Sequence, residues 1–238
     1  MINEYGTWQG NLDEFVSTNN YNASIKLPKD CKTGREIKLY EGVPFMPIEI
    51  DSTLDWNILL DEAKQFDKHY IPHRHHEKHK GWSSLVLHGL SSVHTEAPEV
   101  YGYTCDNAPW RWTDVSKFCP NIVKMIKDNF KFNRYFRIRI MRLSPEGYIW
   151  PHVDGGFNHL GPINIAINNP ENCNFYMGDV GILPFKQGMG MSLNIGSMIH
   201  SVVNNSNENR YHIIIHGGWS DKDKAMDELY YNNYLKYV

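Results

Sequence analysis

The sequence has few cysteines, no long apolar run and almost no excess of charge. Its four cysteines, Cys31, Cys105, Cys119 and Cys173, are scattered and form no CxxC pair, which excludes a disulfide scaffold. No stretch approaches the ~20 apolar residues of a membrane span, and the first residues lack the basic start and apolar run of a signal peptide. With 24 Lys+Arg against 27 Asp+Glu, the net charge of −3 does not favour electrostatic binding to nucleic acid or to an anionic membrane. We therefore expect a cytoplasmic protein that acts on a small molecule or a peptide, without nucleic acid or membrane as partners.

The distribution of apolar and polar residues along the chain predicts one mainly β domain. Residues 1–50 are polar with short apolar clusters, which predicts an irregular N-terminal arm or edge elements, and residues 51–238 then form a single domain. Apolar residues recur at helical spacing over residues 56–66, 120–130 and 220–237. Strand patterns bounded by Gly, Pro, Asn or Asp occur at residues 82–89, 135–143, 148–154, 163–168, 189–194, 198–203 and 210–216. Short strands at this spacing, with flanking helices, favour a sandwich or a barrel.

Within the strand pattern, His152 and Asp154 have the spacing of metal ligands. Residues i and i+2 of a strand point to the same side, so an imidazole and a carboxylate project together from one face. A second histidine would complete the set of two histidines and one carboxylate that binds ferrous iron and leaves positions open for substrate-derived ligands and oxygen. We expect His200 to be this third ligand, with His159 as the alternative.

An arginine follows His200 closely. Residues 200–210 have the pattern of a strand, a polar turn and a returning strand; in a hairpin centred on Asn205, His200 would face Arg210. A guanidinium binds a carboxylate through two parallel hydrogen bonds, so Arg210 could hold the far carboxylate of 2-oxoglutarate while the other end of that molecule binds iron. His212 shares the inner face of the returning strand and is expected beside the same carboxylate.

Two other strands carry polar residues at alternate positions. Asn164 and Asn168 point away from the three isoleucines of residues 163–167 and would need partners if buried, which makes them candidates to hold cosubstrate or substrate. The alternative is the solvent-facing side of an edge strand. Arg137 and Arg139 share one face of residues 135–143, where they would either reach into the site and contact substrate or face water.

Four segments in this order resemble the aspartyl/asparaginyl β-hydroxylase family of 2-oxoglutarate oxygenases. They are residues 139–147, the Pro151-His152-Val153-Asp154 run, residues 200–205 and Arg210, and the resemblance spans residues 80–219. It implies a double-stranded β-helix fold of the jelly-roll or cupin-like kind, with Fe(II), 2-oxoglutarate and O₂. The implied reaction is hydroxylation of a C–H bond, such as the β-carbon of an Asp or Asn residue or of a related small molecule, with release of succinate and CO₂.

The resemblance also implies residue roles. By position, His152, Asp154 and His200 would bind iron and Arg210 would bind 2-oxoglutarate; in some members a polar residue near Asn168 also touches the cosubstrate. The acidic ligand is present, which favours hydroxylation over halogenation, because related halogenases leave the carboxylate position to a halide.

Other readings of the sequence are to be weighed. The stretch 69–79 holds five histidines and could bind zinc or nickel, although such a run is more often a solvated loop. A cupin-like metal enzyme could use the same ligands without 2-oxoglutarate, and a non-catalytic β-sandwich binding protein could carry them as ordinary polar residues. Four tryptophans could line a substrate cleft or belong to the core: Trp82, Trp110, Trp112 and Trp150.

Overall fold

The computed structural model describes residues 2–51, 53–74, 78–219 and 224–238. In these residues the helices are α1 (Leu12–Thr18), α2 (Gly34–Leu39), α3 (Trp56–Lys64), α4 (Pro120–Asn129), α5 (Lys224–Tyr234) and the 3-10 helices η1 (Pro98–Tyr101) and η2 (Asp114–Phe118). The strands are β1 (Phe45–Ile48), β2 (Ile71–Pro72), β3 (Lys80–Gly89), β4 (Arg111–Trp112), β5 (Arg134–His152), β6 (Ile163–Ala166), β7 (Cys173–Met177), β8 (Gly181–Ile182), β9 (Gly190–Leu193), β10 (His200–Asn204) and β11 (Arg210–Gly218). None of the helices in the described ranges is long and apolar enough to span a bilayer.

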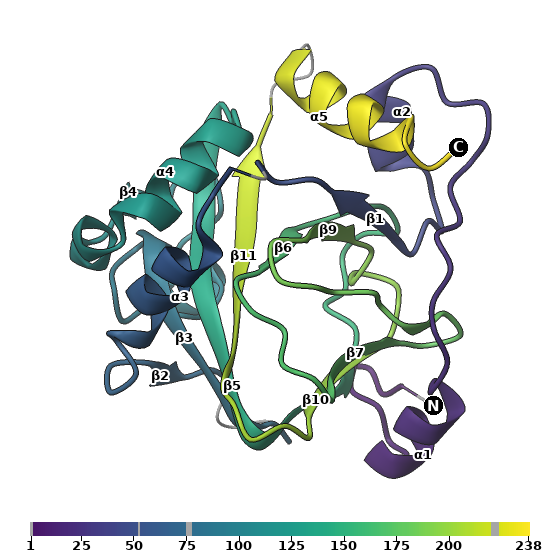
Figure 1. Cartoon of the computed structure of the whole chain (residues 1–238), viewed down its shortest axis with the longest axis horizontal. Coiled ribbons are helices and arrows are strands. Elements are labelled where there is room, and N and C mark those ends of the chain that lie inside the picture. The colour runs from purple at the N-terminus through teal and green to yellow at the C-terminus, as the bar shows by residue number, and fades with distance from the viewer. Residues whose placement is uncertain (1, 52, 75–77, 220–223) are drawn as a thin grey trace.

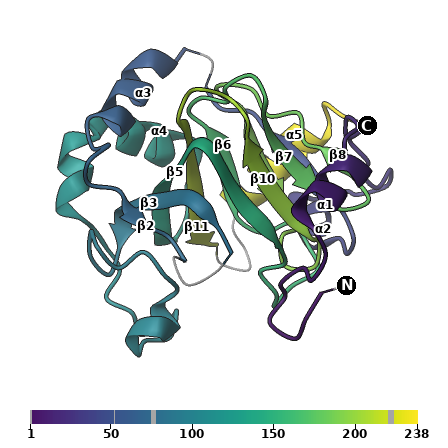
Figure 2. The same cartoon turned by 90° about the horizontal axis from the view of Figure 1, so that it is seen from below.

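The strands form one antiparallel sheet that curls back on itself. Its order is β1-β9-β6-β11-β5-β10-β7-β8, and β3 joins on β5 with the short β2 and β4 beyond it. One side of the curl contains β1, β9, β6, β11, β3 and the first half of β5, and the other contains β10, β7 and β8 (Figures 1 and 2). Neighbouring strands far apart in sequence, closed around an inner cavity, make this a double-stranded β-helix, as the sequence resemblance implied.

The alternation of side chains divides the apolar residues into two cores. The outward-pointing isoleucines pack under α2, α3, α4 and α5, which cover that face (Figure 1); they are Ile138 and Ile140 of β5, Ile163 and Ile165 of β6, and Ile213 and Ile215 of β11. The opposite side chains, including Phe175 of β7, Leu193 of β9 and Val202 of β10, fill the inside of the curl. Successive side chains of a strand point to opposite faces of the sheet, and here both faces are buried. The outer face therefore packs against the helices, and the inner face lines the cavity.

Strand β5 corrects two expectations. The sequence predicted separate strands at residues 135–143 and 148–154, and a hairpin pairing His200 with Arg210; both predictions are wrong. β5 continues through an irregular segment in which Glu146 has φ +57° and a Cβ on Gly147 would lie 2.7 Å from the Ser144 carbonyl oxygen. The first half of β5 pairs with β11 and the second half with β10, so β5 lies between the two strands that were expected to pair.

The helices follow the sequence pattern more closely. The segments expected at 56–66, 120–130 and 220–237 contain α3, α4 and α5, within the described residues. Residues 1–50 contribute the short helices α1 and α2, and the strand β1, which forms the edge of the sheet beside β9.

Candidate active site

A cavity opens inside the curl, between its two sides. Strands β3, β5, β6, β7, β9, β10 and β11 all contribute side chains to its wall. Its apolar lining comes from residues such as Ile149, Phe175 and Leu193, and its polar lining is dominated by arginine and histidine. The cavity therefore has the character of a binding site for a charged ligand.

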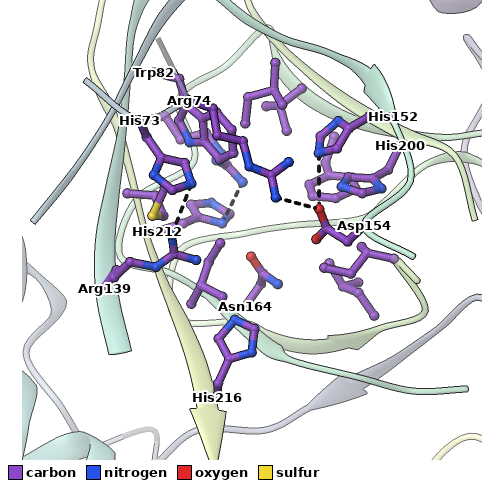
Figure 3. Close-up of a pocket in the computed structure, with 18 of the residues that line it drawn as sticks. His73, Arg74, Trp82, Arg139, His152, Asp154, Asn164, His200, His212 and His216 are labelled. Carbon is purple, nitrogen blue, oxygen red and sulfur yellow. Dashed lines mark hydrogen bonds and ion pairs between the residues drawn. The ribbon is translucent and has the colours of Figure 1, made fainter. Parts of the chain in front are cut away.

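His152, Asp154 and His200 lie together at one side of this cavity (Figure 3). His152 ends β5 and His200 begins β10, and the two residues are register partners, which brings their rings to 4.3 Å between centroids. Asp154 follows β5, where its backbone N–H donates to the Ile195 carbonyl at 2.8 Å. One ligand atom from each residue lies within 4.8 Å of the others. Of the His, Cys, Asp and Glu residues in the described ranges, this is the one group of three so arranged.

Backbone carbonyls fix the orientation of both histidine rings. Nδ1 of His152 bonds to the Trp150 carbonyl at 2.7 Å, and Nδ1 of His200 to the Met198 carbonyl at 3.2 Å. Because a carbonyl only accepts, Nδ1 carries the proton in each ring, and Nε2 is the atom left to bind a metal. Nε2 of His152 lies 3.5 Å from Oδ1 of Asp154.

Electrostatics keep these ligands in the forms that bind metal. Burial, together with the nearby His152, lowers the pKa of His200 to about 3, so its ring is neutral. Burial alone would raise the pKa of Asp154, but the adjacent His152 and the charge of Arg74 outweigh it and hold that pKa below its usual value. Nη2 of Arg74 lies 3.3 Å from Oδ1 of Asp154 (Figure 3).

Arg210 begins β11 and lines the same cavity, 3% exposed. Its Nη2 donates to Nδ1 of His212 at 2.7 Å, and its Nε has no partner. Across the described residues, no carboxylate forms an ion pair with this guanidinium. Burial lowers the pKa of Arg210 to about 10, so it remains charged at neutral pH. A buried cation without a counter-ion is costly, and Arg210 is therefore placed to receive an anionic ligand.

His212 has a free donor beside Arg210. Arginine can only donate, so Nδ1 of His212 accepts and its Nε2 carries the proton; this buried N–H has no partner. His212 lines the cavity, as expected from its place on the inner face of β11. Burial and the neighbouring Arg210 hold its pKa well below the usual value, so the ring stays neutral.

Of the two candidate asparagines, Asn164 lines the cavity and Asn168 does not. Asn164, 4% exposed, lines the cavity from β6, and because β6 lies between β11 and β9 the solvent-facing edge alternative is wrong. Asn168 lies outside the cavity lining. Its Nδ2 donates to the Asn209 carbonyl at 2.9 Å and its Oδ1 accepts from the Tyr211 N–H at 2.6 Å, so it fastens the start of β11.

The histidine-rich stretch supplies part of the wall, which corrects the solvated-loop reading for His73 and His79; residues 75–77 lie outside the described ranges. His73 is 3% exposed, packs edge-on against Trp82 at 4.4 Å and accepts from Nη1 of Arg139 at 3.1 Å (Figure 3). Nδ1 of His79 accepts from the Trp150 N–H at 2.9 Å. Alternation on β5 was the signal that located Arg139, but nothing in the sequence showed that His73 would meet it.

Other candidates lie elsewhere. His159 bonds to the neighbouring Leu160 carbonyl and is not part of the cavity wall. Of the four tryptophans, Trp82 lines the cavity, whereas Trp112 packs against the outer core and Nε1 of Trp150 donates to the Trp8 carbonyl. Trp110 is partly exposed and donates to the Cys105 carbonyl.

Comparison with solved structures finds distant likenesses. The viral collagen prolyl hydroxylase of Paramecium Bursaria Chlorella virus-1, solved with 2OG, is 11% identical over 73% of this chain and 95% of its own, with a TM-score of 0.45. A Pseudomonas putida prolyl-4-hydroxylase is 11% identical over 78% and 96%, with a TM-score of 0.46. A 2OG-Fe(II) oxygenase family oxidoreductase from Burkholderia pseudomallei is 11% identical over 90% and 94%, with a TM-score of 0.47. A search of curated proteins found no match.

The family comparison covers most of the chain. The model of the aspartyl/asparaginyl beta-hydroxylase family matches residues 53–217, a range that runs from just before α3 almost to the end of β11 and includes all three candidate ligands and Arg210. The chain belongs to the aspartyl/asparaginyl β-hydroxylase family of 2-oxoglutarate-dependent oxygenases.

Proposed function

We propose that this oxygenase hydroxylates a C–H bond of an Asp or Asn residue, or of a related small molecule, with iron held by His152, Asp154 and His200 and 2-oxoglutarate by Arg210. One observation carries the proposal: two histidines and a carboxylate share a cavity with a buried guanidinium that lacks a carboxylate partner. A metal chelated by a dicarboxylate cosubstrate needs both features in one place.

The residues present fit a ferrous ion. Two imidazole nitrogens and one carboxylate are a donor set that suits non-heme iron. The ligand atoms lie within 4.8 Å of one another, and the two Nδ1–H groups are already committed to backbone carbonyls, so the rings need not reorient. When bound, iron with 2-oxoglutarate and O₂ supplies the oxidation, in which succinate and CO₂ are released and one oxygen atom enters the C–H bond.

The chain's own residues orient the ligands and keep water out. The Arg210 guanidinium and the Nε2–H of His212 both offer donors to the far carboxylate of 2-oxoglutarate. Asn164, facing the same cavity from β6, offers a neutral amide beside them. Phe175, whose ring stacks on His200 with 5.8 Å between centroids, excludes water from one side of the ligands.

The alternatives agree less well with these findings. A non-catalytic β-sandwich binding protein does not agree with membership of an enzyme family. In a cupin-like enzyme independent of 2-oxoglutarate, the buried charge of Arg210 would lack the anionic ligand that offsets the cost of its burial. Free cysteines and the slight negative net charge support a cytoplasmic enzyme that acts on a peptide or a small molecule, not on nucleic acid.

The test is succinate formation from 2-oxoglutarate by protein loaded anaerobically with Fe(II) and then exposed to air. A panel of Asp- and Asn-containing peptides and free amino acids serves as substrate, and Asp154→Ala is the control. Metal-dependent succinate that one panel member stimulates is the expected result. Iron-loaded protein that forms no succinate, even slowly and without substrate, would overturn the proposal.

A further inference from the structure

We propose that Arg137 and Arg139 form a subsite for an oxyanionic group of the substrate, a carboxylate or a phosphate, on the wall that β5 contributes to the cavity. The proposal rests on the proposed function and specifies its substrate class. It predicts a substrate that carries a negative charge near the carbon that is oxidised, in preference to the corresponding neutral amide.

Both side chains come from the same face of β5. Residues i and i+2 of a strand project in parallel, so the two guanidinium groups are neighbours, and both line the cavity. Arg139 lies with His73 on the side of the cavity opposite to His152, Asp154 and His200 (Figure 3). A group bound there would leave the rest of a substrate to extend across the cavity toward those ligands.

Hydrogen bonds hold the Arg139 guanidinium in place, but they do not use all of its donors. It is 4% exposed; its Nη1 donates to the Thr95 carbonyl at 2.9 Å and to Nε2 of His73 at 3.1 Å, while its Nε is buried without a partner. Nδ1 of His73 lies 3.4 Å from Glu96, so the histidine holds the arginine without neutralising it. Among the ion pairs of the described residues, none joins a carboxylate to the Arg139 guanidinium.

Arg137 has still fewer contacts. In the part of the chain that the structure describes, no hydrogen bond, ion pair or ring contact involves its guanidinium. The side chain is nevertheless only partly exposed and lines the cavity. Donors of a charged group that are removed from water without a partner destabilise the folded protein, and a bound acceptor would relieve this cost.

The charges of the site leave these two arginines unbalanced. The positive charges of Fe(II) and Arg210 are together balanced by the negative charges of Asp154 and the two carboxylates of 2-oxoglutarate. The positive charge of Arg74 is balanced by Glu96, whose carboxylate accepts from the Arg74 backbone N–H at 2.9 Å and lies 4.0 Å from Nε of Arg74. Asp154 is the one acid in the cavity lining of the described residues. With cofactors bound, Asp154 would be committed to iron, and Arg137 and Arg139 would face a cavity whose described lining holds no other acid.

The experiment compares acids with amides of the same skeleton on the Fe(II)- and 2-oxoglutarate-loaded protein without oxygen. Saturating 2-oxoglutarate fills the Arg210 site, and binding is measured by calorimetry and by the melting temperature. The probe pairs are N-acetylglycine and N-acetylglycinamide, phenylacetate and phenylacetamide, and, for the phosphate arm, phenyl phosphate and phenol. The acid or phosphate of a pair should bind at least about 10-fold more tightly than its neutral partner.

Variants of Arg137 test whether this subsite carries the effect. Arg137→Gln should weaken binding of the anionic probe by about 10–100-fold and leave the neutral probe unchanged, and Arg137→Lys should lose less. Arg134→Gln is the matched control, because Arg134 lies on the same strand but its side chain is 43% exposed outside the cavity. Equal affinity for acid and amide, no binding of any anionic probe, or an unchanged preference in Arg137→Gln would overturn the subsite.

The same titration separates this inference from the proposed function. Binding of 2-oxoglutarate to the iron-loaded protein is measured first. If 2-oxoglutarate does not bind, the proposed function fails. If it binds but the anionic probes show no preference, the proposed function stands and the subsite is wrong.

Discussion

His200 and Arg210 reach one cavity from two strands that do not pair with each other, because β5 runs between β10 and β11. His200 is the register partner of His152 near the end of β5, and Arg210 is the partner of Leu143 in its first half. The candidate metal ligands and the candidate anion-binding arginine are therefore positioned by different parts of the same strand. It follows that each group can be altered without displacing the other.

Replacing Asp154 by alanine should impair iron binding. Asp154 supplies the carboxylate of the candidate triad, so the affinity for Fe(II) should fall by more than the roughly 10–100-fold that loss of an outer-shell partner costs. Equilibrium dialysis against Fe(II) under anaerobic conditions measures this. Asp61→Ala, at an exposed position of α3, is the control, and equal iron binding by both variants would remove Asp154 from the site.

Replacing Arg210 by alanine should chiefly raise the KM for 2-oxoglutarate. A hydrogen bond to a charged group contributes about 1.5–3 kcal/mol, which corresponds to about 10–100-fold in affinity, while iron binding should change little. Succinate formation at varied 2-oxoglutarate measures the KM, and iron titration measures the metal site. Arg210→Lys should recover part of the affinity, because it restores the charge without the planar fork. An unchanged KM in Arg210→Ala would contradict the assigned role.

The metal-free protein should lose stability as the pH falls below about 6.5. Burial lowers the pKa values of His73, His88, His212 and His216, and that of His200 to about 3. The unfolded chain then binds protons that the folded chain does not, so the free energy of unfolding decreases between about pH 6.5 and the lower folded-state values. Each such histidine contributes up to about 1.4 kcal/mol per pH unit. Urea unfolding with chelator at pH 7.5, 6.0 and 5.0 measures the slope; a flat profile would show that these rings are protonated in the folded state.

Glu62 should contribute strongly to stability although it lies far from the cavity wall. Its carboxylate, 8% exposed on α3, accepts from the backbone N–H groups of Asn121 and Ile122, both at 2.9 Å, at the start of α4. It thereby caps a helix that begins at Pro120 and has no side-chain cap of its own. Glu62→Ala should lower the free energy of unfolding by about 1–3 kcal/mol, measured by urea unfolding. Glu41→Ala, at an exposed loop position, should change it by less than about 0.5 kcal/mol, and a similarly small effect in Glu62→Ala would refute the cap.

Local patterns were enough to predict the faces of the strands. The alternation of Arg137 and Arg139 with Ile138 and Ile140, and the spacing of His152 and Asp154, follow from the two-residue period of a strand, whatever its partners. The cavity-facing positions on β5, β6 and β11 were therefore predictable, as were the helices with clear amphipathic spacing. Asn168 is the exception, because β6 ends at Ala166 and its amide turns to the backbone of residues 209 and 211.

The sequence by itself determined the side-chain alternation, the ligand types and the family. Only the tertiary structure decided that β5 passes between β10 and β11, that His73 is buried against Arg139, and that Arg137 lines the cavity without a hydrogen bond or ion pair among the described residues. The physical reason is that strand direction is a local property of the backbone, whereas strand partners and buried charge contacts depend on residues far apart in the chain.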